Sequence, residues 1–283
     1  MAEIILAQSL PPHLNLPPLD DLACDDDIPM ETEQHKLQMD LLIYSLKPWL
    51  AQRPDGYVGG NMFVHFIDQA GHREFRGPDV FVALGVPKGI RKNWVVWQEG
   101  KEPDVVIELL SASTLKEDKN EKKQVYQNQL RVKEYFWFDP LNPTDFAGFS
   151  LQRGSYQRLP VDRDGRLISQ QLGLALIRWQ GSYEDLDTIW LRWETLDGVL
   201  LLAPQEIAKQ QQQLARQAQA KAQQAEVKAQ QAEVKAQQAE VKAQQALSTA
   251  AYQHQRAEQL ANQLRALGID PDLIGKTQEH NDE

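Results

Sequence analysis

Residues 103–140 read PDVVIELLSASTLKEDKNEKKQVYQNQLRVKEYFWFDP and set the plan of the chain. They predict a strand over 105–110, a charged helix over about 115–130 and a second strand over 135–138. A crossover through a helix makes its two strands parallel neighbours, so we expect them side by side in one sheet. Glu108 lies inside the first apolar strand. A buried acid is costly without a partner, a proton or a metal, and we favour a metal.

Further polar residues around this unit are candidates for the same site. Strand side chains alternate, so Asp104 shares a face with Glu108 and either supports the site or merely opens the strand. A second Pro-Asp pair places Asp79 at the head of another apolar run, residues 80–84. On the helix, Lys122 and Tyr126 are four residues apart and therefore share a face.

The segment before this unit predicts one helix and two strands. Residues 31–50 have a helical apolar period with Thr32 as N-cap. Glu33 and His35 lie in its first turn, where they either favour the helix start or reach an active site. Residues 57–68 and 74–85 predict an antiparallel pair of strands, with a bend at Gly59–Gly60.

Two further segments complete the predicted core. The loop 86–102 is basic and aromatic, and Lys88, Arg91 and Lys92 with Trp94 could contact phosphates and bases. Downstream, residues 146–152 and 156–160 predict a hairpin, and 172–179 and 188–192 predict further antiparallel strands of the same sheet.

Composition narrows the class of protein. The chain has 283 residues and a formal net charge of -10, but residues 1–33 hold eight acids and no Lys or Arg. The rest is nearly balanced, so a local basic groove is compatible with the total charge. No apolar run approaches the ~18 residues of a membrane helix, and the start shows no signal peptide. A single cysteine, Cys24, fits a reducing cytoplasm, so we expect a cytoplasmic location.

Both ends of the chain differ in composition from the middle. Residues 1–30 are rich in Pro and Asp and predict a disordered leader. Residues 204–267 contain KAQQAEV three times in succession and predict a long helix of coiled-coil type, followed by a disordered terminus over 268–283. Ala222 and Ala225 fit the spacing of positions a and d, which form the seam between two helices of a coiled coil. Near the end of the helix, Leu260 and Leu264 offer stronger apolar contacts to a second helix. We expect a homo-oligomer through this helix, although an Ala seam alone is weak.

Several motifs together resemble a known family. Residues from about 31 to 200 are similar to the cyanobacterial Uma-type family of restriction endonuclease-like proteins, within the PD-(D/E)XK nuclease superfamily. The matching pieces, in chain order, are Gly77-Pro78-Asp79-Val80, Pro103-Asp104-Val105-Val106-Ile107-Glu108, Ser111-Ala112-Ser113-Thr114, Lys122 with Tyr126, and Glu134-Tyr135 before Asp139-Pro140. The superfamily pattern has a lysine two residues after the second acid, where this chain has Leu110.

The resemblance implies an α/β restriction-endonuclease-like core over 31–200, with a mixed central sheet flanked by helices, and the long C-terminal helix as an appendage. It implies a Mg²⁺-dependent (or Mn²⁺-dependent) endonuclease that hydrolyses DNA phosphodiester bonds. Asp79, Glu108 and Lys122 are the implied catalytic residues, with the lysine moved to the helix. Asp79, Glu108 and the backbone of Leu109 are the implied metal ligands. The alternative is an inactive nuclease fold that acts as an interaction module and assembles through its tail.

Overall fold

The computed structural model describes residues 32–111 and 113–271. The chain forms two compact units, Met1–Lys209 and Gln210–Glu283, and each is considered by itself. The predicted leader 1–30, Cys24 and most of the predicted terminus 268–283 lie outside the described residues. Within the described part, no helix combines the length and apolar character of a membrane span.

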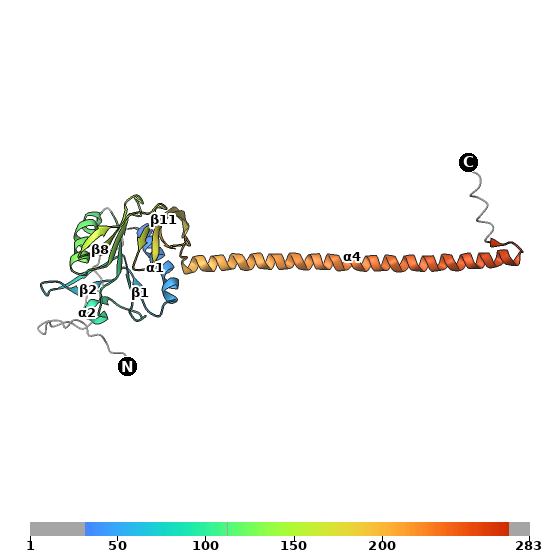
Figure 1. The fold of residues 1–283 in the computed structure, drawn as a ribbon, viewed down its shortest axis with the longest axis horizontal. Helices are drawn as coiled ribbons and strands as arrows, with labels where there is room; N and C mark the ends of the chain where they lie inside the picture. The colour runs from blue at the N-terminus through green and yellow to red at the C-terminus, as the bar shows by residue number, and fades with distance from the viewer. Residues whose placement is uncertain (1–31, 112, 272–283) are drawn as a thin grey trace, which may run out of the picture. The chain divides into compact units, whose positions relative to one another are not determined.

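The first unit is built around a six-stranded mixed sheet (Figure 1). Its strands, in spatial order, are β1 (Tyr57–Gly59), β4 (Val80–Ala83), β6 (Val105–Leu109), β7 (Glu134–Phe138), β8 (Phe146–Gln152) and β9 (Ser155–Arg158). β6 and β7 are parallel with Glu108 opposite Trp137, and the other neighbours are antiparallel. The predicted crossover and the predicted hairpin of β8 and β9 are both confirmed.

One face of this sheet is covered by α1 (Glu33–Ala51) and by a separate sheet of β10 (Leu167–Ser169), β11 (Leu174–Tyr183) and β12 (Leu186–Thr195). Gln38 joins the two covering elements, because its side chain exchanges two hydrogen bonds of 2.8 Å with the backbone of Leu191. Thr32 caps α1 as predicted, accepting a hydrogen bond of 3.1 Å from the His35 amide.

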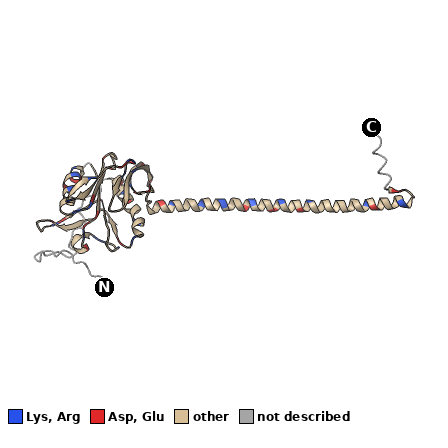
Figure 2. Ribbon diagram, viewed as in Figure 1, with Lys and Arg blue, Asp and Glu red and all other residues tan. Residues whose placement is uncertain are grey.

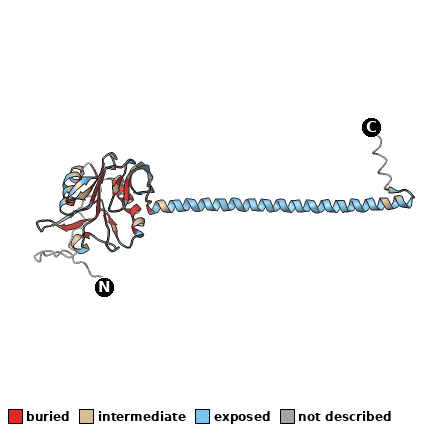
Figure 3. Cartoon of the chain, in the orientation of Figure 1, coloured by how far each residue is buried: buried red, intermediate tan, exposed pale blue. Residues whose placement is uncertain are grey.

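The other face is covered by the rest of the unit. It carries the helical turns η2 (Glu117–Lys122) and α3 (Lys123–Asn128), the strands β2 (Val64–Ile67), β3 (Arg73–Arg76) and β5 (Trp94–Val95), and the short helix α2 (Val96–Glu99). Both faces of β4 and β6 are therefore buried, and the inner strands of this unit are red in Figure 3. Burial on both faces explains the nearly continuous apolar runs of these strands.

One prediction of strand organisation is confirmed only in its pairing, and a second was wrong. Residues 57–68 and 74–85 do pair antiparallel with each other, but each segment breaks into two short strands that belong to different sheets. They break at Gly60 and Pro78, where a Cβ on Gly60 would lie 2.1 Å from the Asp79 carbonyl oxygen and Pro78 has no amide hydrogen. The strands after residue 166 do not extend the central sheet either. They form their own sheet, because Leu174, Leu176 and Trp193 are buried in the core on the α1 side.

The chain then forms α4 (Pro204–Ala266), a single helix of 63 residues. None of its residues is buried, and in Figure 3 the helix is pale blue except for a few intermediate residues near its ends. Its first turn belongs to the first unit, since Glu206 accepts hydrogen bonds of 2.8 and 2.6 Å from the buried Arg192 guanidinium. Gly268, at φ 75°, follows the last turn, as the sequence predicted for the end of this helix.

Candidate active site

The site lies where β4 begins and β6 ends. Asp79 immediately precedes β4, and its Oδ2 accepts a hydrogen bond of 2.7 Å from the Leu109 amide. This bond ties the second Pro-Asp motif directly to the end of β6, thirty residues further along the chain. The neighbouring turn at Gly60 packs against the Asp79 backbone so closely that only glycine fits there.

Glu108 is completely buried on the face of β6 that α3 covers. Its Oε1 accepts a hydrogen bond of 2.8 Å from the Tyr126 hydroxyl, and its Oε2 lies 3.4 Å from Lys122 Nζ. Burial raises the Glu108 pKa well above its usual value, and the nearby Asp79 and Asp118 carboxylates raise it further. Lys122 and Tyr126 oppose this shift in part.

The geometry brings Asp79, Glu108 and Lys122 into one electrostatically coupled group, since both acids act on the lysine. Burial lowers the Lys122 pKa, but Glu108, Asp118 and Asp79 outweigh that effect and leave the pKa raised. Lys122 is therefore a protonated ammonium at neutral pH. Its side chain is 15% exposed and that of Asp79 is 22% exposed, so solvent reaches this side of the group.

Two further residues belong to this group. The Oδ1 of Asp118 lies 2.7 Å from Lys122 Nζ as an ion pair, although the contact lacks hydrogen-bond geometry. Both carboxylate oxygens of Asp118 are buried and accept no hydrogen bond of good geometry from the described residues, and burial raises the pKa of this residue. His35 Nε2 lies 2.9 Å from Asp79 Oδ1.

Asp118 was not among the predicted site residues, although the sequence carries a signal for it. Asp118 lies four residues before Lys122, so the two share a helical face. For His35 the sequence left two alternatives open, and the structure places it against Asp79 rather than in solvent. Glu33, the other residue left open, is exposed.

Asp104 immediately precedes the strand that carries Glu108, but it does not belong to the site. Its carboxylate accepts hydrogen bonds from Lys101 Nζ at 2.7 Å, Lys133 Nζ at 2.8 Å and the Leu84 amide at 2.7 Å. It lies just before β6, whereas Asp79 meets the last residue of that strand. Asp104 therefore links the start of β6 to the neighbouring loops, which answers the question that the sequence left open.

In the basic loop, Lys88 and Lys92 are exposed, so their contact with phosphates stays a prediction, whereas Trp94 and Arg91 are held within the protein. Trp94 is fully buried and donates a hydrogen bond of 3.0 Å to the Lys101 carbonyl, so it cannot stack on a base. Arg91 is held by two hydrogen bonds of 2.6 and 2.9 Å to Glu99 and lies over the Tyr57 and Trp94 rings. These contacts stabilise the loop itself.

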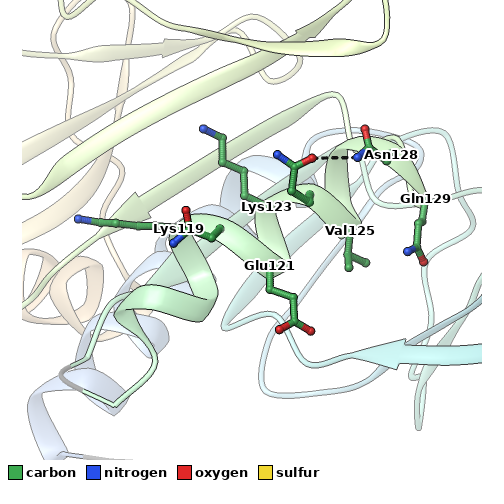
Figure 4. Close-up of a pocket in the computed structure, with 8 residues that line it drawn as sticks. Lys119, Glu121, Lys123, Val125, Asn128 and Gln129 are labelled. Atoms are coloured by element: carbon green, nitrogen blue, oxygen red, sulfur yellow. Dashed lines mark hydrogen bonds between the residues drawn. The ribbon is translucent and has the colours of Figure 1, made fainter.

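A separate hollow of about 590 Å³ lies on the outer side of η2 and α3 (Figure 4). Lys119, Glu121, Lys123 and Gln129 line it, and Lys122 does not. Lys123 Nζ lies 3.4 Å from the centre of the Phe149 ring, and burial lowers the pKa of this lysine. This hollow is distinct from the carboxylate group on the inner side of the same helices.

The donor set can be compared with the needs of a metal ion. In the described part of the chain, no group of three or more His, Cys, Asp and Glu side chains is arranged to hold a metal. Three carboxylates nevertheless act on one another here, with Lys122 as their lysine partner. Carboxylate oxygens are the ligands that Mg²⁺ and Mn²⁺ prefer, and an excess of buried negative charge favours a cation. Asp79, Glu108 and Asp118 therefore supply oxygen donors of the kind that such an ion takes, although the described residues do not form a cluster of three ligands.

The comparisons with known proteins agree with the motifs. A family model described as "Uma2: Putative restriction endonuclease" matches residues 27–182. The chain belongs to the Uma2 family. The match covers the central sheet, the carboxylate group and part of the second sheet, and it places the chain among nuclease-type proteins. The predicted family and the α/β fold class are both confirmed.

Other comparisons add less. The crystal structure of a putative nuclease belonging to DUF820 from Anabaena variabilis ATCC 29413 is similar at a TM-score of 0.39 and 13% identity. The similarity covers 51% of this chain and 76% of that one. No curated protein matches the Uma2 chain.

Proposed function

We propose that this Uma2 protein is a metal-dependent endonuclease that hydrolyses phosphodiester bonds in DNA. The observation that supports the proposal is the coupled group of Asp79, Glu108 and Lys122 at the solvent-accessible end of β6. Phosphodiester hydrolysis needs an activated water and stabilisation of the negative charge that develops on the phosphate.

Each residue has a distinct part in this proposal. Asp79 and Glu108, with the backbone of Leu109, would hold Mg²⁺ or Mn²⁺, and the ion would lower the pKa of bound water and neutralise phosphate oxygens. Lys122, already protonated, orients the attacking water and offsets the developing charge. His35 holds Asp79 through its 2.9 Å contact, and Asp118 holds Lys122 through its ion pair. Both act as positioning residues.

The test is DNA cleavage by the full-length protein with Mg²⁺ or Mn²⁺, on supercoiled and linear substrates, with an RNA of equal length alongside. Asp79→Asn, Glu108→Gln and Lys122→Met should each reduce DNA cleavage at least a thousandfold. Asp118→Asn should reduce it about tenfold, because the ammonium is less well held. Glu121→Gln is the matched control, since this exposed residue lies next to Lys122 in sequence and outside the group. Cleavage that survives in all the site variants contradicts the proposal.

A second function is favoured by one observation. Glu108 is already satisfied by Tyr126 and Lys122, which is also what an inactive fold kept as an interaction module would show. In that function the protein assembles through α4 as a homo-oligomer and binds a partner without cleaving DNA. A wild-type protein whose melting temperature ignores millimolar Mg²⁺ and Mn²⁺, and which cleaves neither nucleic acid, selects this alternative.

A further inference from the structure

One face of α4 has an unbroken alternation of three-residue and four-residue steps. It runs from Ala208 through Gln211, Ala215, Ala218 and Ala222 to Leu260 and Leu264, and Leu267 continues the spacing one residue past the end of the helix. Alanine fills most of these positions, glutamine fills two of them (Gln211 and Gln253), and the last three are leucines. Such spacing keeps the positions on one side of two supercoiled helices, where they correspond to positions a and d of a heptad.

This face has no partner within the described chain. No residue of α4 is buried, and Leu260 and Leu267 are 52% and 76% exposed. Alanine positions let two helix backbones approach closely, while the three leucines at the end add apolar area. A helix of 63 residues with its whole seam in water lacks the tertiary packing that stabilises most protein helices.

The charged residues beside this face indicate what binds to it and in which orientation. With Ala222 at a and Ala225 at d, glutamates occupy e (Glu226, Glu233, Glu240) and lysines occupy g (Lys221, Lys228, Lys235). The two signs alternate along the helix in Figure 2. Each lysine precedes a glutamate by five residues, so they cannot pair on one helix at i, i+4. Within the described part of the chain, the lysines and glutamates of the repeats form no salt bridge, unlike charged pairs such as Lys36–Asp40 and His254–Glu258.

Five residues is the separation that joins position g of one helix to position e of its neighbour in a parallel, in-register pair. Lys221 then faces Glu226 of a second copy, and the next two repeats pair in the same way. In an antiparallel pair, g faces g and e faces e, so lysine would face lysine and glutamate would face glutamate. We propose that α4 binds α4 of a second copy as a parallel, in-register, two-stranded coiled coil. This inference is independent of the proposed nuclease reaction.

The first experiment measures orientation by disulfide formation in the full-length chain. On a Cys24→Ser background, Ala215→Cys and Ala257→Cys should each give covalent dimers under mild oxidation, because equivalent a positions face each other. Gln217→Cys is the matched control, since it lies in the same turn as Ala215 on the outer side and should stay uncrosslinked. Crosslinking that appears only in mixtures of Ala215→Cys with Leu260→Cys would show an antiparallel pair and overturn the inference.

The second experiment tests the charges by sedimentation equilibrium, with helix content followed by circular dichroism. The wild type should have twice the chain mass of 32.3 kDa. Replacing Lys221, Lys228 and Lys235 with Glu should raise the dimer dissociation constant about tenfold or more at low salt, and less at high salt. Replacing Glu226, Glu233 and Glu240 with Lys should do the same, and an equimolar mixture of the two variants should restore the dimer. A monomeric wild type, or variants that dimerise like the wild type, would refute the proposal.

Discussion

At the scale of single residues, the protein concentrates three carboxylates around one lysine. Glu108 is the most deeply placed, and its pKa is raised by burial and by its acidic neighbours. Lys122 Nζ forms ion pairs with Glu108 Oε2 at 3.4 Å and with Asp118 Oδ1 at 2.7 Å. Three acids surround a single lysine. Removing one acid therefore relieves repulsion between carboxylates, whereas removing Lys122 leaves the carboxylates without a cation.

Glu108→Gln and Lys122→Met should therefore differ in stability without metal. The glutamine keeps the shape and the Tyr126 contact and removes one buried negative charge, so the free energy of unfolding should be equal or higher. The methionine leaves Glu108 and Asp118 buried without a cation, which should cost about 3 kcal/mol. Urea unfolding at pH 7 measures both, with the exposed Lys116→Met as control. Equal destabilisation by both changes would show that Glu108 serves mainly as a structural ion-pair partner.

At the scale of elements, short segments hold the site in place. η2 is a π-helical stretch, and the carbonyl of Asp118 within it accepts a hydrogen bond of 2.8 Å from the Tyr135 hydroxyl. Such widened turns are rare and are often found at functional sites. At Asp79, the turn at Gly60 packs directly against the backbone carbonyl.

Gly60→Ala should displace Asp79. The added Cβ would lie 2.1 Å from the Asp79 carbonyl oxygen, so backbone must move, and we expect a loss of about 2 kcal/mol in unfolding free energy. Cleavage should fall as well, since the carboxylate moves with its backbone. Gly89→Ala is the matched control, because a Cβ there meets nothing within 4 Å. Thermal unfolding and DNA cleavage that match the control would mean that the turn does not position Asp79.

The start of β6 depends on a different carboxylate and should respond to pH. Burial raises the Asp104 pKa, but the Leu84 amide, Lys101 and Lys133 outweigh it and leave the pKa below its ordinary value of 3.8. A lowered pKa means that folding favours the charged form, so its contribution is present above pH 3.8 and is lost as the pH falls below it. Asp104→Asn should cost about 2 kcal/mol at pH 7 and progressively less toward pH 3. The exposed Glu102→Gln should cost nothing at either pH, and a constant Asp104→Asn deficit would contradict the assignment.

At the scale of the whole molecule, the boundary between the first unit and the second lies inside α4 rather than at its first residue. The sequence places the start of the tail at Pro204. Glu206, however, pairs with Arg192, whose side chain is 1% exposed, and it also accepts a hydrogen bond of 2.8 Å from the Ala203 amide. The first turn of α4 is therefore part of the first unit.

Two truncations should separate these parts. A chain that ends at residue 209 keeps Glu206 and should melt close to the temperature of the full-length protein. A chain that ends at residue 204 leaves the Arg192 guanidinium buried without its carboxylate and should lose about 3 kcal/mol. Glu206→Gln in the full-length chain should reproduce most of that loss. Equal melting of the two truncations would show that the ion pair contributes little.

The sequence by itself determined the crossover from β6 to β7, the position of Glu108 within a buried strand, the helical caps and the heptad of α4. These features follow from apolar residues that recur with periods of two, 3.6 and seven residues. Such periods can be recognised in the sequence without any knowledge of contacts between distant residues. The motifs between Gly77 and Pro140 carried the resemblance to the family, and that resemblance implied Asp79 and Lys122 as catalytic residues.

Only the tertiary structure decided which residues meet. It divided the predicted strands between two sheets at Gly60 and Pro78, kept β10 to β12 apart from the central sheet, and buried Trp94 inside the basic loop. It also brought His35 and Asp118 to the carboxylate group. The physical reason is that these outcomes depend on how the two faces of the central sheet are packed. Packing joins residues far apart in the chain, so no local period records it.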